Sequence, residues 1–168
     1  SVRKLKPDPV PDNLVNEILE AGRWAPSWAN TQCWEIVDVQ DEDLRMKLQA
    51  TLPSKNPSYK AIADAPKLLA VCGRKGRSGY IEGEMVNKHG DWYMYDLGLM
   101  TQNLCLAAHS LGLGTVVVGW YDLEEAERIL NCPYDVDVVT LIPMGYRAQK
   151  GHVPPHRPIA EFVHTNTF

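Results

Sequence analysis

The stretch 91-DWYMYDLGLMTQNLCLAAHSLGLG-114 predicts the longest regular element of the chain. We expect a helix from Asp91 to a stop at Gly112, because apolar residues recur along one stripe at helical spacing. That stripe holds Leu97, Met100, Leu104, Ala108 and Leu111. The other faces of this helix are apolar too, which is typical of a helix packed on most of its sides. The sequence therefore predicts a helix at the centre of the fold.

Shorter elements are expected on both sides of this helix. Expected helices cover residues 11–25, 42–52 and 122–130, and expected strands cover 34–39, 67–72, 115–120 and 136–146. Asp41 and Asp122 are the expected helix caps. The Gly-rich, charged residues 73–90 are predicted to form a mobile excursion. Because helices and strands alternate without strict register, we expect an α+β or α/β sandwich around a mixed sheet.

Length and composition are those of one globular domain over residues 1–168, with 45% hydrophobic and 23% charged residues. The net charge of −4 and the lack of a basic stripe argue against nucleic acid. No apolar run approaches the ~20 residues needed to span a bilayer, and no signal peptide opens the chain. Four widely separated cysteines favour buried thiols over disulfides or zinc. A cytoplasmic protein without membrane partners is expected.

Two motifs suggest ligand sites that we reject. Gly112, Gly114 and Gly119 are spaced somewhat like a dinucleotide fingerprint, but they follow a helix and precede a strand, the reverse of what such a site requires. Gly112 is better explained as a helix C-cap. His152 and His156 are four residues apart, but two prolines separate them and no carboxylate lies between them. Loop histidines are the better interpretation than a metal site.

The segment 23-RWAPSWANTQCWEIV-37 contains an unusual loop. Ser27, Asn30 and Gln32 are uncharged polar residues placed beside large aromatic rings, whereas most surface loops are charged or Gly-rich. Ser1 with Arg3, and Arg157, are further polar or basic candidates far away in the sequence. Each also has a simple structural explanation, as a turn former or a solvated charge. Spacing alone leaves both interpretations open.

Taken in order, these pieces resemble the FMN-dependent nitroreductase family. The resemblance lies in residues 1–34, in 96-DLGLMTQNLCLAAHSLGLGTVVVGW-120, in 142-IPMGYR-147 and in PHRP before IAEFV near the end. Only residues 53–88 lack a recognisable signature. The resemblance implies an α+β fold with a mixed central sheet flanked by helices. It also implies an intertwined homodimer, with FMN at the subunit interface, the long helix in that interface and 159-IAEFVHTNTF-168 as the arm that embraces the partner.

The resemblance also implies which residues bind the cofactor. Pro26, Ser27 and Asn30 would line the flavin, with Asn30 on its pyrimidine edge, and Gln32 would either join them or hold the loop. Trp28 would narrow the substrate cavity or stack on a ligand.

On the other side of the flavin, Arg3 would lie near N1 and O2, where positive charge favours the anionic reduced form. Ser1 and Arg157 would meet the phosphate. Val118 and Gly119 would pass along the ring, with Gly119 allowing close approach. Lys60 is a weaker candidate for a further basic contact.

The function implied is a ping-pong oxidoreductase without a protein catalytic residue. NAD(P)H would reduce the flavin at N5, and a nitroaromatic, quinone or similar conjugated acceptor would then occupy the same space. Two alternatives stay open: a flavin-binding or sequestering protein with little turnover, and a specialised flavin dehydrogenase or reductive dehalogenase of the same fold. A lid formed by residues 73–90 would favour the second alternative.

Overall fold

A four-stranded sheet forms the middle of the protein in the computed structural model, which describes residues 1–149, 151 and 153–168. Its strands lie in the order β1 (Trp34–Val39), β2 (Lys67–Arg74), β6 (Val136–Tyr146) and β5 (Leu113–Thr115). All three pairings are antiparallel. The α+β class is confirmed, but a mixed sheet is not observed among these strands. Val39 at the end of β1 pairs with Leu68 at the start of β2. The helices between them therefore bring the chain back to the same end of the sheet at which β1 ends, and β2 runs in the opposite direction.

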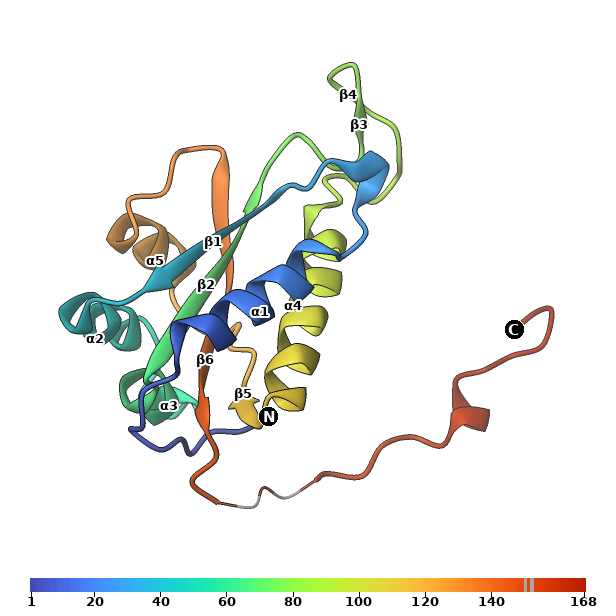
Figure 1. Ribbon diagram of the computed structural model, residues 1–168. Helices are drawn as coiled ribbons and strands as arrows, with labels where there is room; N and C mark the ends of the chain where they lie inside the picture. The colour runs from blue at the N-terminus through green and yellow to red at the C-terminus, as the bar shows by residue number, and fades with distance from the viewer. Residues whose placement is uncertain (150, 152) are drawn as a thin grey trace.

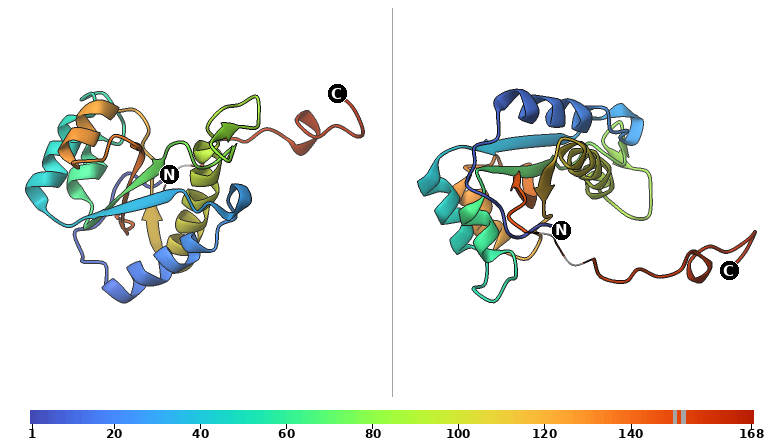
Figure 2. Two further views of the ribbon diagram at one scale, coloured as in Figure 1. Left: turned by 90° about the horizontal axis from the view of Figure 1, so that it is seen from above. Right: turned by 60° about the horizontal axis from the view of Figure 1, so that its bottom comes forward.

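Helices cover both faces of the sheet (Figures 1 and 2). One face packs against α1 (Asp12–Arg23) and α4 (Tyr93–Ser110), and the other packs against α2 (Glu42–Ala50), α3 (Tyr59–Asp64) and α5 (Leu123–Ile129). Strand β2 shows why both faces are apolar. Its Leu69 and Val71 join the core of α1 and α4, while Leu68, Ala70 and Cys72 join the opposite core. Successive side chains of a strand point to opposite faces, so a fully apolar strand suits a central position.

Several expected boundaries are confirmed. Strands β1 and β6 have the predicted bounds. The Asp41 side chain accepts a hydrogen bond from the backbone N–H of Leu44 at 2.7 Å and so caps α2. Asp122 caps α5 in the same way, at 3.1 Å from the N–H of Glu125. Gly112 has φ +81° just after α4, as a C-cap glycine does.

Other expectations about secondary structure are wrong. The strand predicted at 115–120 is observed as β5 at Leu113–Thr115, and beyond it Val118 makes an isolated bridge to Leu141. Val116 and Val118 remain buried, but in the core on the α5 side. The β-branched residues here therefore mark an extended segment that is buried in the core, and not a strand hydrogen-bonded along its length to a neighbour. Helix α3 was not predicted, and the excursion at 73–90 contains a small hairpin, β3 (Tyr80–Ile81) with β4 (Glu84–Met85).

Helix α4 is covered on one side within the single chain. Leu97, Met100 and Leu104 are buried against α1 and the sheet. Tyr95 and Leu106, by contrast, are 59% and 57% exposed. The prediction that this helix is packed on most sides is therefore wrong for one chain taken alone. Large apolar side chains on a free helix face are typical of a protein–protein contact.

The C-terminal tail extends away from the body of the protein (Figures 1 and 2). It contains one short turn of 3-10 helix, Ile159–Glu161. Its apolar side chains are exposed, among them Ile159, Phe162, Val163 and Phe168. An extended segment with exposed apolar residues suits contact with another molecule.

Candidate functional site

The loop at residues 27–32, called the 27–32 loop below, has a strained backbone. Ala29, Asn30 and Gln32 have φ values of +43°, +56° and +46°. A left-handed conformation costs about 1 kcal/mol or more for a residue with a side chain. Such strain persists only where the surrounding structure imposes it, and it is concentrated at functional sites. The geometry therefore singles out the same loop as the sequence did.

Side chains within the loop hold part of this shape. The hydroxyl of Ser27 accepts a hydrogen bond from the backbone N–H of Gln32 at 3.0 Å, and Nε2 of Gln32 donates to Oδ1 of Asn30 at 3.2 Å. Asn30 and Gln32 are both exposed. Ser27 and Gln32 thus act at least in part as loop formers, while the Asn30 amide lies at the surface. Pro26, which precedes the loop, is exposed as well.

Aromatic rings flank the loop where it meets the start of α4. The ring of Trp28 lies 6.1 Å from that of Trp92, which lies 5.4 Å from Tyr95. Nε1 of Trp28 and the hydroxyl of Thr31 are buried without a hydrogen-bond partner among the residues described. Unsatisfied buried polar atoms are uncommon in proteins. Together with the φ values, they show a loop whose shape is not the one of lowest local energy.

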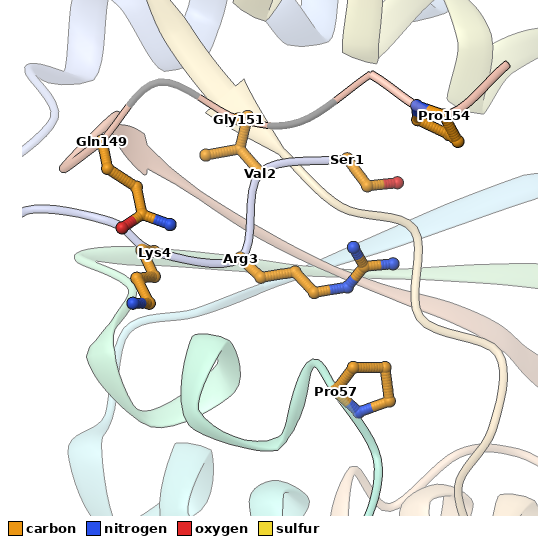
Figure 3. A pocket seen from close by; sticks show the side chains of 8 residues that line it. All are labelled: Ser1, Val2, Arg3, Lys4, Pro57, Gln149, Gly151 and Pro154. Atoms are coloured by element: carbon orange, nitrogen blue, oxygen red, sulfur yellow. The ribbon is translucent and has the colours of Figure 1, made fainter.

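The N-terminal segment forms a second candidate region. It is anchored by backbone hydrogen bonds from the N–H of Val2 to the carbonyl of Thr115 and from the N–H of Lys6 to the carbonyl of Tyr146, both 2.8 Å. Ser1 and Arg3 line a cavity of about 500 Å³, called the N-terminal cavity below, together with Val2, Lys4, Pro57, Gln149, Gly151 and Pro154. In Figure 3 the Arg3 side chain extends between Ser1 and Pro57.

Two residues that sequence reasoning missed support this cavity. Nε of Arg3 donates to the hydroxyl of Ser58 at 3.3 Å. Asn56 accepts from the N–H of Ser58 at 2.8 Å and donates to the carbonyl of Trp120, also at 2.8 Å. The only signal in the sequence is the turn-forming triplet Asn-Pro-Ser at 56–58, which predicts a loop but not its partners.

The other predicted residues on this side are placed as follows. Val118 is buried, and Gly119 is exposed, with no atom of the described residues within 4 Å of the position a Cβ would take. Lys60 lines a neighbouring cavity of about 490 Å³ that also contains Arg3 and Lys4. Arg157 lies outside the lining of the N-terminal cavity. It donates to the carbonyl of Glu161 at 2.8 Å within the tail instead.

The two candidate regions lie at opposite ends of α4. The N–H of Trp28 is bonded to Asp96 in the first turn of this helix, whereas Val2 is bonded to Thr115 just beyond its last turn. An 18-residue helix is about 27 Å long. Figure 1 shows the same separation, with the loop near the β3–β4 hairpin and the N-terminus near β5. One chain therefore does not bring Arg3 and Asn30 to the same ligand atom.

Cys33, directly after the loop, is an inert thiol. It is fully buried, and burial together with the nearby charge of Asp96 raises its pKa to about 12. The thiol accordingly stays protonated and lies 3.5 Å from a carboxylate oxygen of Asp96, to which it donates. A thiol is a nucleophile only as the thiolate, so Cys33 is not a candidate for covalent catalysis.

Among the residues that the structure describes, no cluster of three or more His, Cys, Asp or Glu side chains could hold a metal ion. His152 of the rejected metal motif lies outside the described residues, and His156 lines a small cavity with Ser1 and Arg3. The helices of residues 1–149, 151 and 153–168 include none with the length and apolar character of a membrane span.

Comparison with known proteins identifies the family. The pattern of the nitroreductase family matches residues 1–146. A Methanothermobacter thermautotrophicus protein, provisionally named NADH dehydrogenase/NAD(P)H nitroreductase, is 31% identical over 89% of this chain and 73% of its own length. An NADH dehydrogenase of Thermus thermophilus is 29% identical over 94% of this chain and 86% of its own length.

Solved structures agree. NADPH:FMN oxidoreductase from Vibrio harveyi, in complex with NAD+, superposes with a TM-score of 0.84 at 27% identity and covers 100% of this chain and 74% of that one. The sequence match, the fold and the two candidate regions lead to one conclusion: the chain belongs to the nitroreductase family.

Proposed function

We propose that two copies of this chain enclose FMN between the N-terminal cavity of one and the 27–32 loop of the other. The enzyme would use NAD(P)H to reduce a nitroaromatic, quinone or similar conjugated acceptor. The general activity, NAD(P)H-dependent flavin oxidoreduction, follows from membership of the nitroreductase family. The observation that supports the finer proposal is that the 27–32 loop and the N-terminal cavity lie at opposite ends of α4.

The residues present fit FMN. Its phosphate needs hydroxyl or cationic donors, and Ser1 lines the N-terminal cavity. Arg3 in the same cavity would supply the positive charge expected near N1 and O2 of the ring. Its ring needs uncharged hydrogen-bonding groups beside apolar walls. The exposed Asn30 supplies such a group, because its Oδ1 is engaged by Gln32 and its Nδ2 has no hydrogen bond among the described residues. The open space at Gly119 admits a flat group close to the backbone.

FMN, when bound, would supply the redox chemistry, with NAD(P)H as the electron donor and a ping-pong order of donor and acceptor. The chain itself binds and orients. Arg3 contributes a permanent positive charge to the cavity, and the Ser58 hydroxyl holds its guanidinium in place. Asn30 would fix the polar edge of the ring. Ser1 and Arg157 are proposed phosphate contacts, Arg157 by way of the tail, and Pro26 and Val118 are proposed walls.

The first experiment is an absorption spectrum of the purified protein before and after anaerobic addition of NADH or NADPH. We expect an oxidised flavin spectrum that bleaches on reduction. A flavin spectrum that does not bleach with either donor would favour the flavin-binding alternative. A colourless protein that does not take up added FMN would refute the proposal. Reduction without turnover of nitroaromatics and quinones would favour a specialised substrate instead.

A further inference from the structure

Asp96 is a buried carboxylate that accepts hydrogen bonds from two separate segments of the chain. It is 1% exposed. Its oxygens accept hydrogen bonds from the backbone N–H of Trp28 at 3.1 and 3.2 Å, from the hydroxyl of Ser78 at 2.6 Å and from the thiol of Cys33 at 3.5 Å. Trp28 belongs to the 27–32 loop, Cys33 leads into β1, and Ser78 belongs to the excursion that carries the β3–β4 hairpin. The stretch 27–33 and the excursion that carries the hairpin therefore meet at one side chain.

The charge of Asp96 is balanced without a cation. No ion pair among the described residues includes it. It lies in the first turn of α4, where the free N–H groups of a helix favour a negative charge. Burying a carboxylate is expensive even when it is hydrogen-bonded, and apolar packing would often be at least as stable. A role in setting geometry explains this residue better than a role in stability.

The segment around Ser78 is tied to the same place by its backbone. Ser78 is fully buried, and its carbonyl accepts from the N–H of Trp92 at 2.9 Å, one residue before α4. The N–H of Val86 returns to the carbonyl of Gly79 at 3.0 Å and closes the base of the hairpin. Ser78 thus lies next to the hairpin base in the chain and bonds to the same carboxylate that Trp28 uses.

We propose that Asp96 is a positioning residue that holds the 27–32 loop in its strained, ligand-presenting shape and couples that loop to the β3–β4 hairpin through Ser78. Asp96 does not touch the ligand; it acts through Trp28. Loss of its carboxylate frees Ala29, Asn30 and Gln32 to leave the left-handed region. The Asn30 amide then no longer has a fixed position. This inference rests on the proposed function where it concerns FMN, but its structural part concerns the protein alone.

The structural part is tested by amide hydrogen exchange on ligand-free protein. In Asp96→Asn one acceptor oxygen becomes a donor NH2 group, so Trp28 and Ser78 compete for the oxygen that is left. We expect faster exchange in both 27–33 and 78–86. Ser78→Ala should also accelerate exchange in 27–33, because its hydroxyl bonds to Asp96. Acceleration in 76–87 alone, with 27–33 unchanged, would overturn the coupling.

The ligand part is tested by FMN titration of the same variants. We expect Asp96→Asn to raise the dissociation constant about tenfold or more, the usual effect of losing a hydrogen bond to a charged group. Ser78→Ala should raise it less and add little in the double variant, since both act through one carboxylate.

Asp41→Asn is the matched control. Asp41 also accepts a backbone N–H, from Leu44, but on the opposite layer of the protein. Because Asn caps a helix about as well as Asp, Asp41→Asn should leave the melting temperature, FMN affinity and exchange in 27–33 nearly unchanged. If Asp41→Asn and Asp96→Asn lost FMN affinity equally, the effect of Asp96 would be one on general stability, and the proposed positioning role would be refuted. Failure of the wild-type chain to bind FMN would refute the proposed function, and the exchange experiment would still decide the role of Asp96.

Discussion

Complementation between two inactive variants tests whether each FMN site draws on two chains. Arg3→Ala removes the guanidinium from the N-terminal cavity, which Lys4 also lines. Asn30→Gly removes the amide of the 27–32 loop and, because glycine adopts positive φ freely, does not add strain at φ +56°. The two positions lie near opposite ends of a helix about 27 Å long. Each variant homodimer should therefore carry two sites with the same single defect.

Mixed dimers give a quantitative expectation. If the variants are refolded together in equal amounts, about half of the dimers contain one chain of each kind. In a site shared between chains, each mixed dimer has one site with both changes and one with neither. About one quarter of all sites should then be intact, although neither parent has any.

The assay is tightly bound flavin per protomer after gel filtration, together with NAD(P)H oxidation by the same fractions. Wild-type protein and each variant refolded alone are the controls. A mixture that binds no more flavin than the mean of the two parents would refute the shared site, since one chain would then supply both groups.

Three further outcomes are expected. Arg3→Ala should weaken FMN binding about 10- to 100-fold through loss of a charge-assisted bond, whereas the exposed Lys6→Ala should not; equal losses in titrations of both would point to net charge instead. Gly119→Ala should leave the melting temperature nearly unchanged, because its Cβ meets nothing within 4 Å, yet lower FMN affinity; unchanged affinity would remove Gly119 from the site. Stability to urea should fall as pH rises above the ordinary thiol range. Burial raises the pKa of Cys33 and Cys72 to about 12, so the unfolded chain loses these protons first as the pH rises. The free energy of unfolding should therefore fall by roughly 1 kcal/mol per pH unit for each thiol. A flat profile between pH 9 and 11 would contradict those shifts.

Local chemistry made part of this fold predictable from the sequence. Strands β1 and β6 have their predicted bounds because their apolar and β-branched runs are flanked by residues that end strands. Caps at Asp41 and Asp122 and the turn at Gly112 depend on neighbours within a few residues, so they too were predicted. The antiparallel direction of the strands was not predicted. It depends on where the helices between two strands, such as α2 and α3 between β1 and β2, bring the chain back to the sheet.

The site was predicted in its parts but not in its arrangement. Pattern and family resemblance selected Arg3 and Asn30, yet no local signal shows that they lie at opposite ends of α4. Ser58 and Asn56 were missed because their partners are 55 and 64 residues away in the chain. Nothing in the sequence singles out Asp96, whose role is suggested only by the three donors that surround it in the structure.

The anchoring of the 27–32 loop by Asp96 has a consequence for a chain that is still being synthesised. Trp28 leaves the ribosome 68 residues ahead of the carboxylate that holds it. At about 5–20 residues per second, the loop waits roughly 3 to 14 s for its anchor. Unsupported left-handed residues relax during that interval. In a nascent chain the 27–32 loop therefore does not take its final shape until α4 has emerged and docked. Cofactor binding is accordingly expected only after most of the chain has been synthesised.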